Sequence, residues 1–582
     1  MSQSSTHNTP CRFSCSGSLA SSGLDLLSAG SSLEVDIHTI RSVETKVQQH
    51  VRESTHLELP GNSLFDLSEC LAPEILGHIF WWNVISGVSL SGRIARDTFN
   101  FLLVCRRWFD VATSTPSLWA FWGTSLRECL AFYRYSGDVP LYLNLVESNT
   151  SRDIREAGIV FQDPSVRRRI RDLHVHTSPK TLARILSSMS TPQQSPVRSQ
   201  IQSLMLTVGR PCITELSQEL PDITNFLDTH SLPDLRSLHL HGCVLRWESL
   251  IPQTSKLTRL FIHVRNEFKK PTVLQLITLF SRNRALEQIS LSLEIVPTLD
   301  NSLPDSSASV FLPHLRRLAV YGNAAGHAQL LNLLTFSNEL EHVDTDLFLD
   351  GIVTDVAAAL TPFLPNLFIN RRPSDLAVHI TYIMAGLSIN VLQPGERDDT
   401  EDFLVLKISS RDMGFWGVSP ALPEEVIKRL PTANVTGLNI RRYSAMFRQD
   451  FRHLFQATSA VREFCIMDSA IDDIVRVLAS PSPIEEEDEP THLPHLQTFR
   501  LKDINFALPS HANTAAHLGR LLEQRYKDGL PLSKLSMAYC PHFSWGACSA
   551  PANYLKDHLC WDRYEAAGGR RSVCETCHSK CF

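Results

Sequence analysis

The sequence predicts an α/β chain in which a small all-α helical module is followed by an irregular array of strand-and-helix repeats. Three observations lead to this prediction. Apolar residues recur at helical spacing within residues 66–126, a leucine-rich phrase recurs from about residue 141 onward, and a chain of 582 residues is too long for one hydrophobic core. We therefore expect at least two domains.

Composition narrows the class of protein. Hydrophobic residues make up 43% of the chain and charged residues 20%, which is typical of a globular protein. The formal net charge of −6 argues against a dedicated nucleic-acid binder, because neutralising phosphates needs a concentrated basic surface. The longest apolar segment, residues 377–392, contains polar residues and is too short to cross a bilayer, so we expect no membrane association.

The first part of the chain divides into two segments. Residues 1–32 are rich in serine, and we expect a disordered tail there. This segment lacks a basic start followed by an apolar run, so it does not read as a secretory signal, and we expect a cytoplasmic or nuclear protein. Residues 33–58 have apolar residues every three or four positions, which predicts an amphipathic helix that packs on the following module or forms a short coiled coil.

Residues 66–126 contain two further helical patterns. Their apolar members are Ile75, Leu76, Ile79 and Phe80 in the first pattern and Leu103, Val104, Trp108 and Val111 in the second. These spacings predict two short helices, each with one apolar side. Because two such helices cannot bury those sides completely against each other, we expect a surface that is completed by a partner helix.

The same residues carry a resemblance to a known family. Leu71-Ala-Pro73-Glu74-Ile75-Leu76 and Val104-Cys105-Arg106-Arg107-Trp108 resemble the F-box phrases of large protein families in basidiomycete fungi, with Ala72 in place of a proline. The resemblance implies binding to the adaptor subunit of an SCF-type ubiquitin ligase and, through it, to a cullin. The adaptor-facing residues that it implies are Leu71, Pro73, Ile75, Leu76, Ile79, Leu103, Val104, Cys105 and Trp108.

A second pattern begins at about residue 141. The phrases Leu232–Leu240, Leu312–Val320 and Leu493–Leu501 share the spacing L-x-x-L-x-x-L-x-[LV], with Phe499 at the third position of the last, and weaker copies occur between them. Their marker residues are 173, 204, 238, 260, 289 and 318, and then 438, 464, 499 and 535. A strand and a helix in each interval is the geometry of leucine-rich repeats, so we expect residues 141–547 to form a solenoid of that kind. The alternative is an irregular α/β domain in which the leucine spacing is coincidental.

The strands predict a surface for a target protein. Side chains alternate along a strand, so the residues between the buried leucines point outward. The candidates for target binding are His239, Arg259, Phe261, Arg317, Tyr321, Arg441, Arg500 and Lys502. Because cationic residues outnumber acidic ones at these positions, we hypothesise an acidic or phosphorylated target segment. The alternative is that these cations serve solubility.

The last segment, residues 548–582, is rich in cysteine and histidine. Cys574 and Cys577 form one C-x-x-C pair and Cys581 adds a third thiolate, so these are candidate zinc ligands. A second C-x-x-C pair at a familiar distance is missing, so we predict no firm metal site and no RING domain.

The sequence predicts no catalytic residues and no cofactor, because phosphate-loop, zinc-helix and nucleophile-elbow motifs are missing. We therefore expect a non-catalytic substrate receptor of a ubiquitin ligase. The alternative is a protein-binding scaffold, outside any ligase, whose F-box-like helices are only structural.

Overall fold

The computed structural model divides into two compact units, residues 1–149 (unit 1) and 150–582 (unit 2), and each is described by itself. The described residues are 71–87, 96–122, 132–146, 163–190, 197–209, 220–264, 270–297, 309–337, 340–349, 376–383, 386–392, 402–410, 435–441, 451–469, 471–479, 492–508, 511, 513–540 and 558–561. The predicted tail 1–32 and amphipathic helix 33–58 lie outside these residues, as does the segment 548–582 except for its strand at 558–561.

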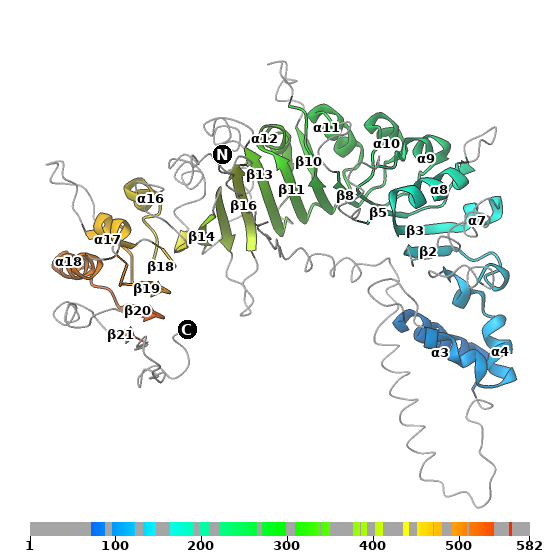
Figure 1. Cartoon of the computed structure of the whole chain (residues 1–582), viewed down its shortest axis with the longest axis horizontal. Coiled ribbons are helices and arrows are strands. Elements are labelled where there is room, and N and C mark those ends of the chain that lie inside the picture. The colour runs from blue at the N-terminus through cyan, green and yellow to red at the C-terminus, as the bar shows by residue number, and fades with distance from the viewer. Residues whose placement is uncertain are drawn as a thin grey trace, which may run out of the picture. The chain divides into compact units, whose positions relative to one another are not determined.

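Unit 1 contains both helices and strands (Figure 1). Its elements are α3 (Pro73–Gly87), the 3-10 helix η1 (Arg96–Leu103), α4 (Arg106–Thr113), the 3-10 helix η2 (Pro116–Trp119), β1 (Phe121–Trp122) and β2 (Leu141–Val146). The two strands pair in parallel, with Phe121 opposite Tyr142.

Aromatic packing holds the helices of unit 1 together. Leu76, Phe80 and Val84 follow one another at four-residue intervals on α3 and are buried. The ring of Phe80 stacks on Phe101 with centroids 4.4 Å apart and meets Trp108 at 5.0 Å. Aromatic pairs in this range add about 0.5–1.5 kcal/mol beyond the area that they bury. One side of α3 is therefore fixed against η1 and α4.

Unit 2 is built from strands and helices in alternation over much of its length. Its helices are α7 (Pro164–Arg169), α8 (Pro179–Met189), α9 (Thr224–Thr229), α10 (Trp247–Gln253), α11 (Val273–Arg282), α12 (Ala324–Asn332), α16 (Phe451–Ala457), α17 (Ile471–Ala479) and α18 (Thr514–Lys527). Its strands are β3 (Ile170–Thr177), β4 (Val197–Arg198), β5 (Ser203–Val208), β6 (His230–Ser231), β7 (Ser237–His241), β8 (Arg259–His263), β9 (Gln288–Ser292), β10 (Val310–Leu312), β11 (Arg317–Asn323), β12 (Leu334–Phe336), β13 (His342–Leu349), β14 (Leu376–Ile383), β15 (Gly386–Leu392), β16 (Asp402–Ser410), β17 (Val435–Arg441), β18 (Glu463–Met467), β19 (Thr498–Lys502), β20 (Lys534–Ala538) and β21 (His558–Trp561).

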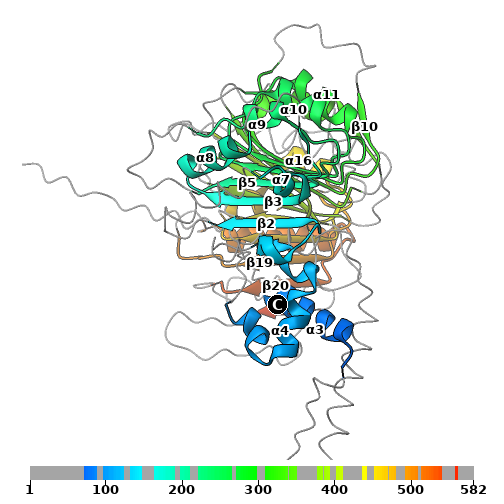
Figure 2. The same ribbon diagram turned by 90° about the vertical axis from the view of Figure 1, so that its right-hand side faces the viewer.

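One large, mainly parallel sheet forms the centre of unit 2 (Figures 1 and 2). From β3 its order is β3-β5-β7-β8-β9-β11-β13-β16-β15-β14-β17-β18-β19-β20-β21. Strand β15 is antiparallel to both of its neighbours, whereas the other pairings in this order are parallel. Two small parallel sheets, β4-β6 and β10-β12, accompany the large one.

Buried aliphatic side chains lie in register across the sheet. Leu173, Leu204, Leu238, Leu260, Ile289, Leu318 and Val343 are directly opposite one another on successive strands, and all are buried. Leu438, Phe464, Phe499 and Leu535 form a second such row on β17 to β20. The ten marker residues of the leucine-rich phrase are all in these two rows, so the predicted strands are confirmed.

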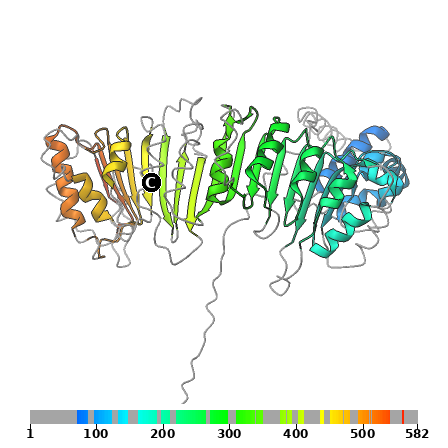
Figure 3. The ribbon, with the colours of Figure 1, turned by 90° about the horizontal axis from the view of Figure 1, so that it is seen from above.

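Helices cover one face of this sheet (Figures 1 and 3). Phe455 of α16 packs edge-on against Phe464 of β18 with centroids 5.6 Å apart, which identifies the covered face as the one that carries the buried rows. The alternate residues of each strand point to the opposite face. We call that side the polar face.

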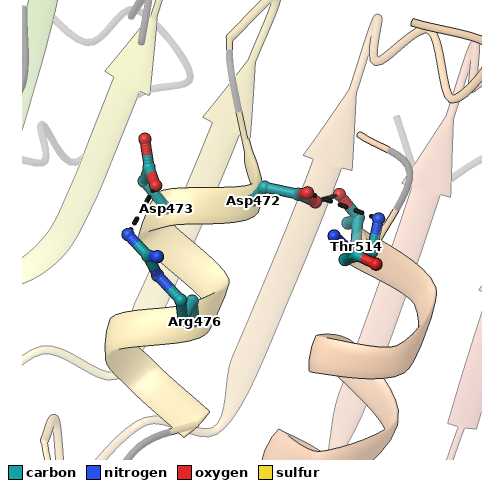
Figure 4. A network of polar contacts seen from close by, with 5 residues as sticks. Asp472, Asp473, Arg476 and Thr514 are labelled. Carbon is teal, nitrogen blue, oxygen red and sulfur yellow. Dashed lines mark hydrogen bonds and ion pairs between the residues drawn. The ribbon is translucent and has the colours of Figure 1, made fainter. Parts of the chain in front are cut away.

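The first turns of α17 and α18 are joined by one carboxylate (Figure 4). Asp472 of α17 accepts hydrogen bonds from the Thr514 hydroxyl and from the backbone N–H of Asn513, at the start of α18. Asp473 accepts a separate bond from Arg476 Nη2 at 2.7 Å. A carboxylate at a helix N-terminus is favourable because unpaired N–H groups and the helix dipole meet there. Asp472 serves two helix termini at once.

The predicted fold class is wrong in both of its parts, although the chain is α/β. Unit 1 is not an all-α F-box module, because β1 and β2 form a parallel pair within it. Unit 2 is not a leucine-rich-repeat solenoid. The middle of its sheet leaves chain order, and β14 and β15 join as an antiparallel hairpin without a helix between them. This hairpin also accounts for the apolar segment 377–392, and among the described residues no helix is long and apolar enough to span a membrane.

We predict that Gly326→Ala destabilises unit 2, although alanine is the better helix former by about 1 kcal/mol. Gly326 lies in α12, and an added Cβ would stand 2.4 Å from the backbone oxygen of Ile295. Overpacking of this kind costs about 1–3 kcal/mol. Urea denaturation should therefore give a lower free energy of unfolding than for the wild type. An unchanged or higher free energy of unfolding would contradict the close packing of α12 on the segment after β9 that contains Ile295.

Candidate functional site

Unit 1 exposes apolar side chains on the helices that resemble an F-box. We call this group the apolar surface; it consists of Ile75, Ile79 and Trp82 on α3, Leu103 on η1, Val104 between η1 and α4, and Phe109 on α4. Ile75 is 42% exposed and Leu103 is 84% exposed, so these side chains are largely in water. Isolated exposed apolar residues are ordinary, but Ile75, Ile79 and Trp82 follow one another at four- and three-residue intervals along α3, which makes this group a candidate interaction site.

Helix α3 explains why this surface exists. Its sequence is apolar on two sides, because Leu76, Phe80 and Val84 face the interior while Ile75 and Ile79 do not. The described residues of unit 1 cover the side of α3 that carries Leu76, Phe80 and Val84, whereas Ile75 and Ile79 stay exposed. The exposed side of α3 is therefore a candidate binding surface.

The start of α3 is held by a cation from α4. Arg107 Nη2 donates a hydrogen bond of 2.6 Å to the backbone oxygen of Leu71, which precedes the helix. Trp119 Nε1 donates a similar bond of 2.7 Å to the backbone oxygen of Ala112 at the end of α4. These bonds fix the two helices that carry the apolar surface.

The nine residues that the resemblance implied fall into three groups. Pro73, Ile75, Ile79, Leu103 and Val104 are exposed, Leu71, Cys105 and Trp108 are half-buried, and Leu76 is buried in the core. Sequence reasoning did not find Trp82 and Phe109, although both are large apolar residues at helical spacing from Ile79 and Cys105. Leu76 and the ring of Trp108 contribute to the packing within unit 1.

The predicted target-binding residues all lie on strands of the sheet, and the structure separates them into two groups. His239, Arg259, Phe261, Arg317 and Tyr321 lie on β7, β8 and β11, whereas Arg441, Arg500 and Lys502 lie on β17 and β19. Strands β13, β16, β15 and β14 stand between β11 and β17. At about 4.8 Å per strand, the groups are roughly 24 Å apart across the sheet. An extended peptide needs about seven residues, at roughly 3.3 Å each, to reach from one group to the other.

One member of the first group, His239, belongs to a cluster of histidines. We call His174, His176, His239, His241 and His263 the imidazole cluster; these residues alternate with buried aliphatic residues on β3, β7 and β8. The His239 ring stacks on Phe261 with centroids 5.5 Å apart, and His263 lies 6.1 Å from His239 and 5.9 Å from His241. His174 Nε2 is 3.2 Å from Ser203 Oγ. The alternations Leu173-His174-Val175-His176 and Leu238-His239-Leu240-His241 were the sequence signal for this cluster.

Three members of the imidazole cluster, His174, His239 and His263, have lowered pKa values, so these rings are neutral at neutral pH. Burial lowers the pKa of His239 to about 3, and the neighbouring imidazoles of His263, His241 and His174 lower it further. Burial, followed by repulsion from His241, lowers the pKa of His263 to about 4. Burial also lowers the pKa of His174.

Acidic residues follow on the next strands of the polar face. The Tyr321 hydroxyl on β11 donates a 2.6 Å hydrogen bond to Asp344 on β13. Burial and this hydrogen bond, together with the charges of Asp344 and Asp346, raise the pKa of Tyr321, which therefore stays protonated. Tyr321 is thus engaged within the sheet.

The second group is cationic. We call Arg441 on β17, Arg500 and Lys502 on β19, and Lys534 on β20 the basic cluster. Arg441 and Arg500 are exposed, and Lys502 and Lys534 are half-buried. Glu463 on β18 forms an ion pair with Arg500, with 3.2 Å between Glu463 Oε2 and Arg500 Nη2. Both side chains remain about half exposed. An exposed pair of this kind contributes about 0–1 kcal/mol, so it can open at little cost.

The candidate zinc ligands Cys574, Cys577 and Cys581 lie outside the described residues. Within the described part of the chain, no group of three or more His, Cys, Asp or Glu side chains has the geometry to hold a metal ion. Neither a protein-family model nor a curated protein sequence matches this chain. What the protein does must therefore be inferred from its own residues.

We predict that the imidazole cluster makes unit 2 less stable in acid. Below pH 6.5 the unfolded chain takes up protons on His174, His239 and His263 while the folded chain does not, because their folded-state pKa values are lowered. Their contribution to stability is therefore present above that pH and is lost as the pH falls toward 4. The loss is at most about 1.4 kcal/mol per pH unit for each shifted histidine. Urea denaturation between pH 7 and pH 4.5 measures it.

The double variant His239→Phe/His263→Phe should flatten this pH dependence. His453→Phe, on an exposed position of α16, is the matched control and should leave it unchanged. If the double variant loses stability in acid as steeply as the wild type, these two histidines do not cause the effect.

Proposed function

We propose that this chain is the substrate-recognition subunit of an SCF-type ubiquitin ligase, in which the apolar surface of unit 1 binds the adaptor subunit and the polar face of unit 2 binds the target. The proposal is carried by the exposure of Ile75, Ile79 and Leu103 at positions that the F-box resemblance assigns to the adaptor. The proposal includes a cytoplasmic or nuclear location for this chain, because such ligases act there.

The apolar surface can supply a large part of the free energy needed to bind a partner helix. Burying one large apolar side chain contributes about 1.5–3 kcal/mol. The six side chains of the surface are already partly covered, and half of that value for each gives about 5–9 kcal/mol. Association costs roughly 4–15 kcal/mol, so the surface supports binding when polar contacts at its rim add to it. Helix-in-groove binding with anchors three and four residues apart is the matching mode.

In this role the chain carries out no bond chemistry. One unit is held by the ligase scaffold and the other holds the target, so that a lysine of the target stays near the ubiquitin-charged enzyme. Tethering raises the effective concentration of the two reactants, which accelerates transfer without a catalytic side chain in this chain.

A second function is favoured by one observation. Leu76, Phe80 and Trp108 are part of the internal packing of unit 1, so the resemblance could reflect a helical core alone. The chain would then be a protein-binding scaffold outside any ligase. Co-purification with the adaptor and a cullin discriminates between the two functions.

We predict that Ile75→Asp/Ile79→Asp/Leu103→Asp abolishes co-purification with the adaptor, with at least a tenfold loss. These side chains are exposed, so the thermal unfolding midpoint of the variant should stay close to that of the wild type. Leu274→Asp is the matched control, because Leu274 is a 60% exposed apolar residue on α11 of unit 2, and it should retain the adaptor. Undiminished association of the triple variant would contradict the proposed function.

A further inference from the structure

We infer that the basic cluster on β17 to β20 binds an extended segment of a partner protein in which carboxylates occur at every second residue. The inference rests on the proposed function only in that this partner would be the ligase target. It assigns the binding to one end of the sheet and to carboxylate groups, whereas the sequence left both an acidic and a phosphorylated segment open.

The register of the strands brings the four cations together. Arg500 and Lys502 are two residues apart on β19 and point to the same face, so their Cα atoms are about 6.6 Å apart. Thr498 pairs with Lys534, which places Lys534 diagonally next to Arg500 at about 7–8 Å. Arg441 pairs with Met467 and Met467 with Lys502, so Arg441 lies two strands away, at about 10 Å.

This spacing matches an extended peptide. In such a segment, side chains two residues apart point the same way and are also about 6.6 Å apart. Carboxylates at alternate positions would therefore stand opposite Arg500 and Lys502 at the same time. A third carboxylate would come within reach of Arg441 or Lys534, because these long side chains extend several ångströms over the sheet.

The contacts within the cluster favour carboxylate over phosphate. Glu463 already pairs with Arg500 on this face, so its carboxylate occupies the kind of position that a partner carboxylate would take. Acidic residues also end the two central strands, since Asp468 follows β18 and Asp503 follows β19, and both are exposed. The Arg500–Glu463 pair is thus an internal example of the carboxylate contact that the partner would make.

One thiol lies among these charges. Cys465 on β18 pairs with Arg500 across the strands. Burial raises the pKa of Cys465, Arg500 and Lys502 lower it, and Asp503 and Glu463 raise it. All four charged groups therefore act on the same point of the polar face.

Outside the basic cluster, the described cations of the polar face include Arg259 on β8 and Arg317 on β11, which lie on either side of β9. In the same part of the sheet, His239 and His263 carry no charge at neutral pH, and the carboxylate of Asp344 on β13 repels an acidic partner. We therefore assign the acidic segment to the end of the sheet formed by β17 to β20, where four cations are grouped.

The test measures binding of a fluorescent nine-residue peptide of alternating Ser and Glu to the full chain, by anisotropy at about 50 mM salt. A peptide with Gln in place of Glu is the neutral probe. We expect the Glu peptide to bind and the Gln peptide not to bind. Arg500→Glu/Lys502→Glu should weaken binding at least tenfold, and Glu463→Gln should strengthen it because the Arg500 guanidinium is freed. Arg317→Glu, at an exposed position on β11, is the matched control and should bind like the wild type.

Three results would overturn the inference. They are the absence of binding by the Glu peptide, equal binding by the wild type and Arg500→Glu/Lys502→Glu, and binding of a phosphoserine peptide where the Glu peptide does not bind. Adaptor co-purification is measured on the same variants. If peptide binding fails while the adaptor still co-purifies, the inference fails alone and the proposed function stands.

Discussion

The structure of unit 2 depends on one constraint, the in-register burial of aliphatic side chains along a parallel sheet. Leu173, Leu204 and Leu238 begin a row that continues strand by strand to Val343, and every member is buried. Burial of one such side chain contributes about 1.5–3 kcal/mol, so the row as a whole outweighs any single polar contact on the sheet. Since side chains alternate, fixing this row also fixes which residues reach the other face.

The strands of this row could be predicted because the buried positions of each strand can be recognised in its own short sequence. The leucine-rich phrase marks each buried position, and residues 260 and 318 identify β8 and β11 as clearly as any others. The order β13-β16-β15-β14-β17 could not be predicted, because it is decided by pairing between segments far apart in the sequence. The same leucine spacing is compatible with a regular solenoid and with this sheet. Because the spacing does not distinguish the two, the predicted repeat class was wrong. Strand β15, which pairs antiparallel on both sides, is the clearest departure.

The candidate site in unit 1 was predictable in part. Ile75 and Leu76 are adjacent, similar in size and equally apolar, yet one is exposed and the other is buried. The difference arises from the position of α3 against Phe101 and Trp108, which the helical periodicity of the segment does not contain. The periodicity identified the helix and its excess of apolar residues, while only the fold assigned them to an inner and an outer side.

Arginine shows the same limit in unit 2. Arg525 of α18 is buried and donates hydrogen bonds to the backbone oxygens of Leu493 and Leu496, so it holds a loop to a helix. Arg500 on the neighbouring strand is exposed and paired with Glu463. Residue type gives the chemistry available at a position, and burial decides whether that chemistry serves the fold or a partner.

The alternation of histidine with leucine on β3 and β7 also protects the alignment of the strands while the chain folds. A slip of one residue in either strand would drive two imidazoles into the aliphatic layer and turn two buried aliphatic residues toward water. Threonine or serine at those positions would make such a mistake cheaper, because a small hydroxyl is easier to bury than an imidazole. These histidines thus help to select one alignment of the strands from its close competitors.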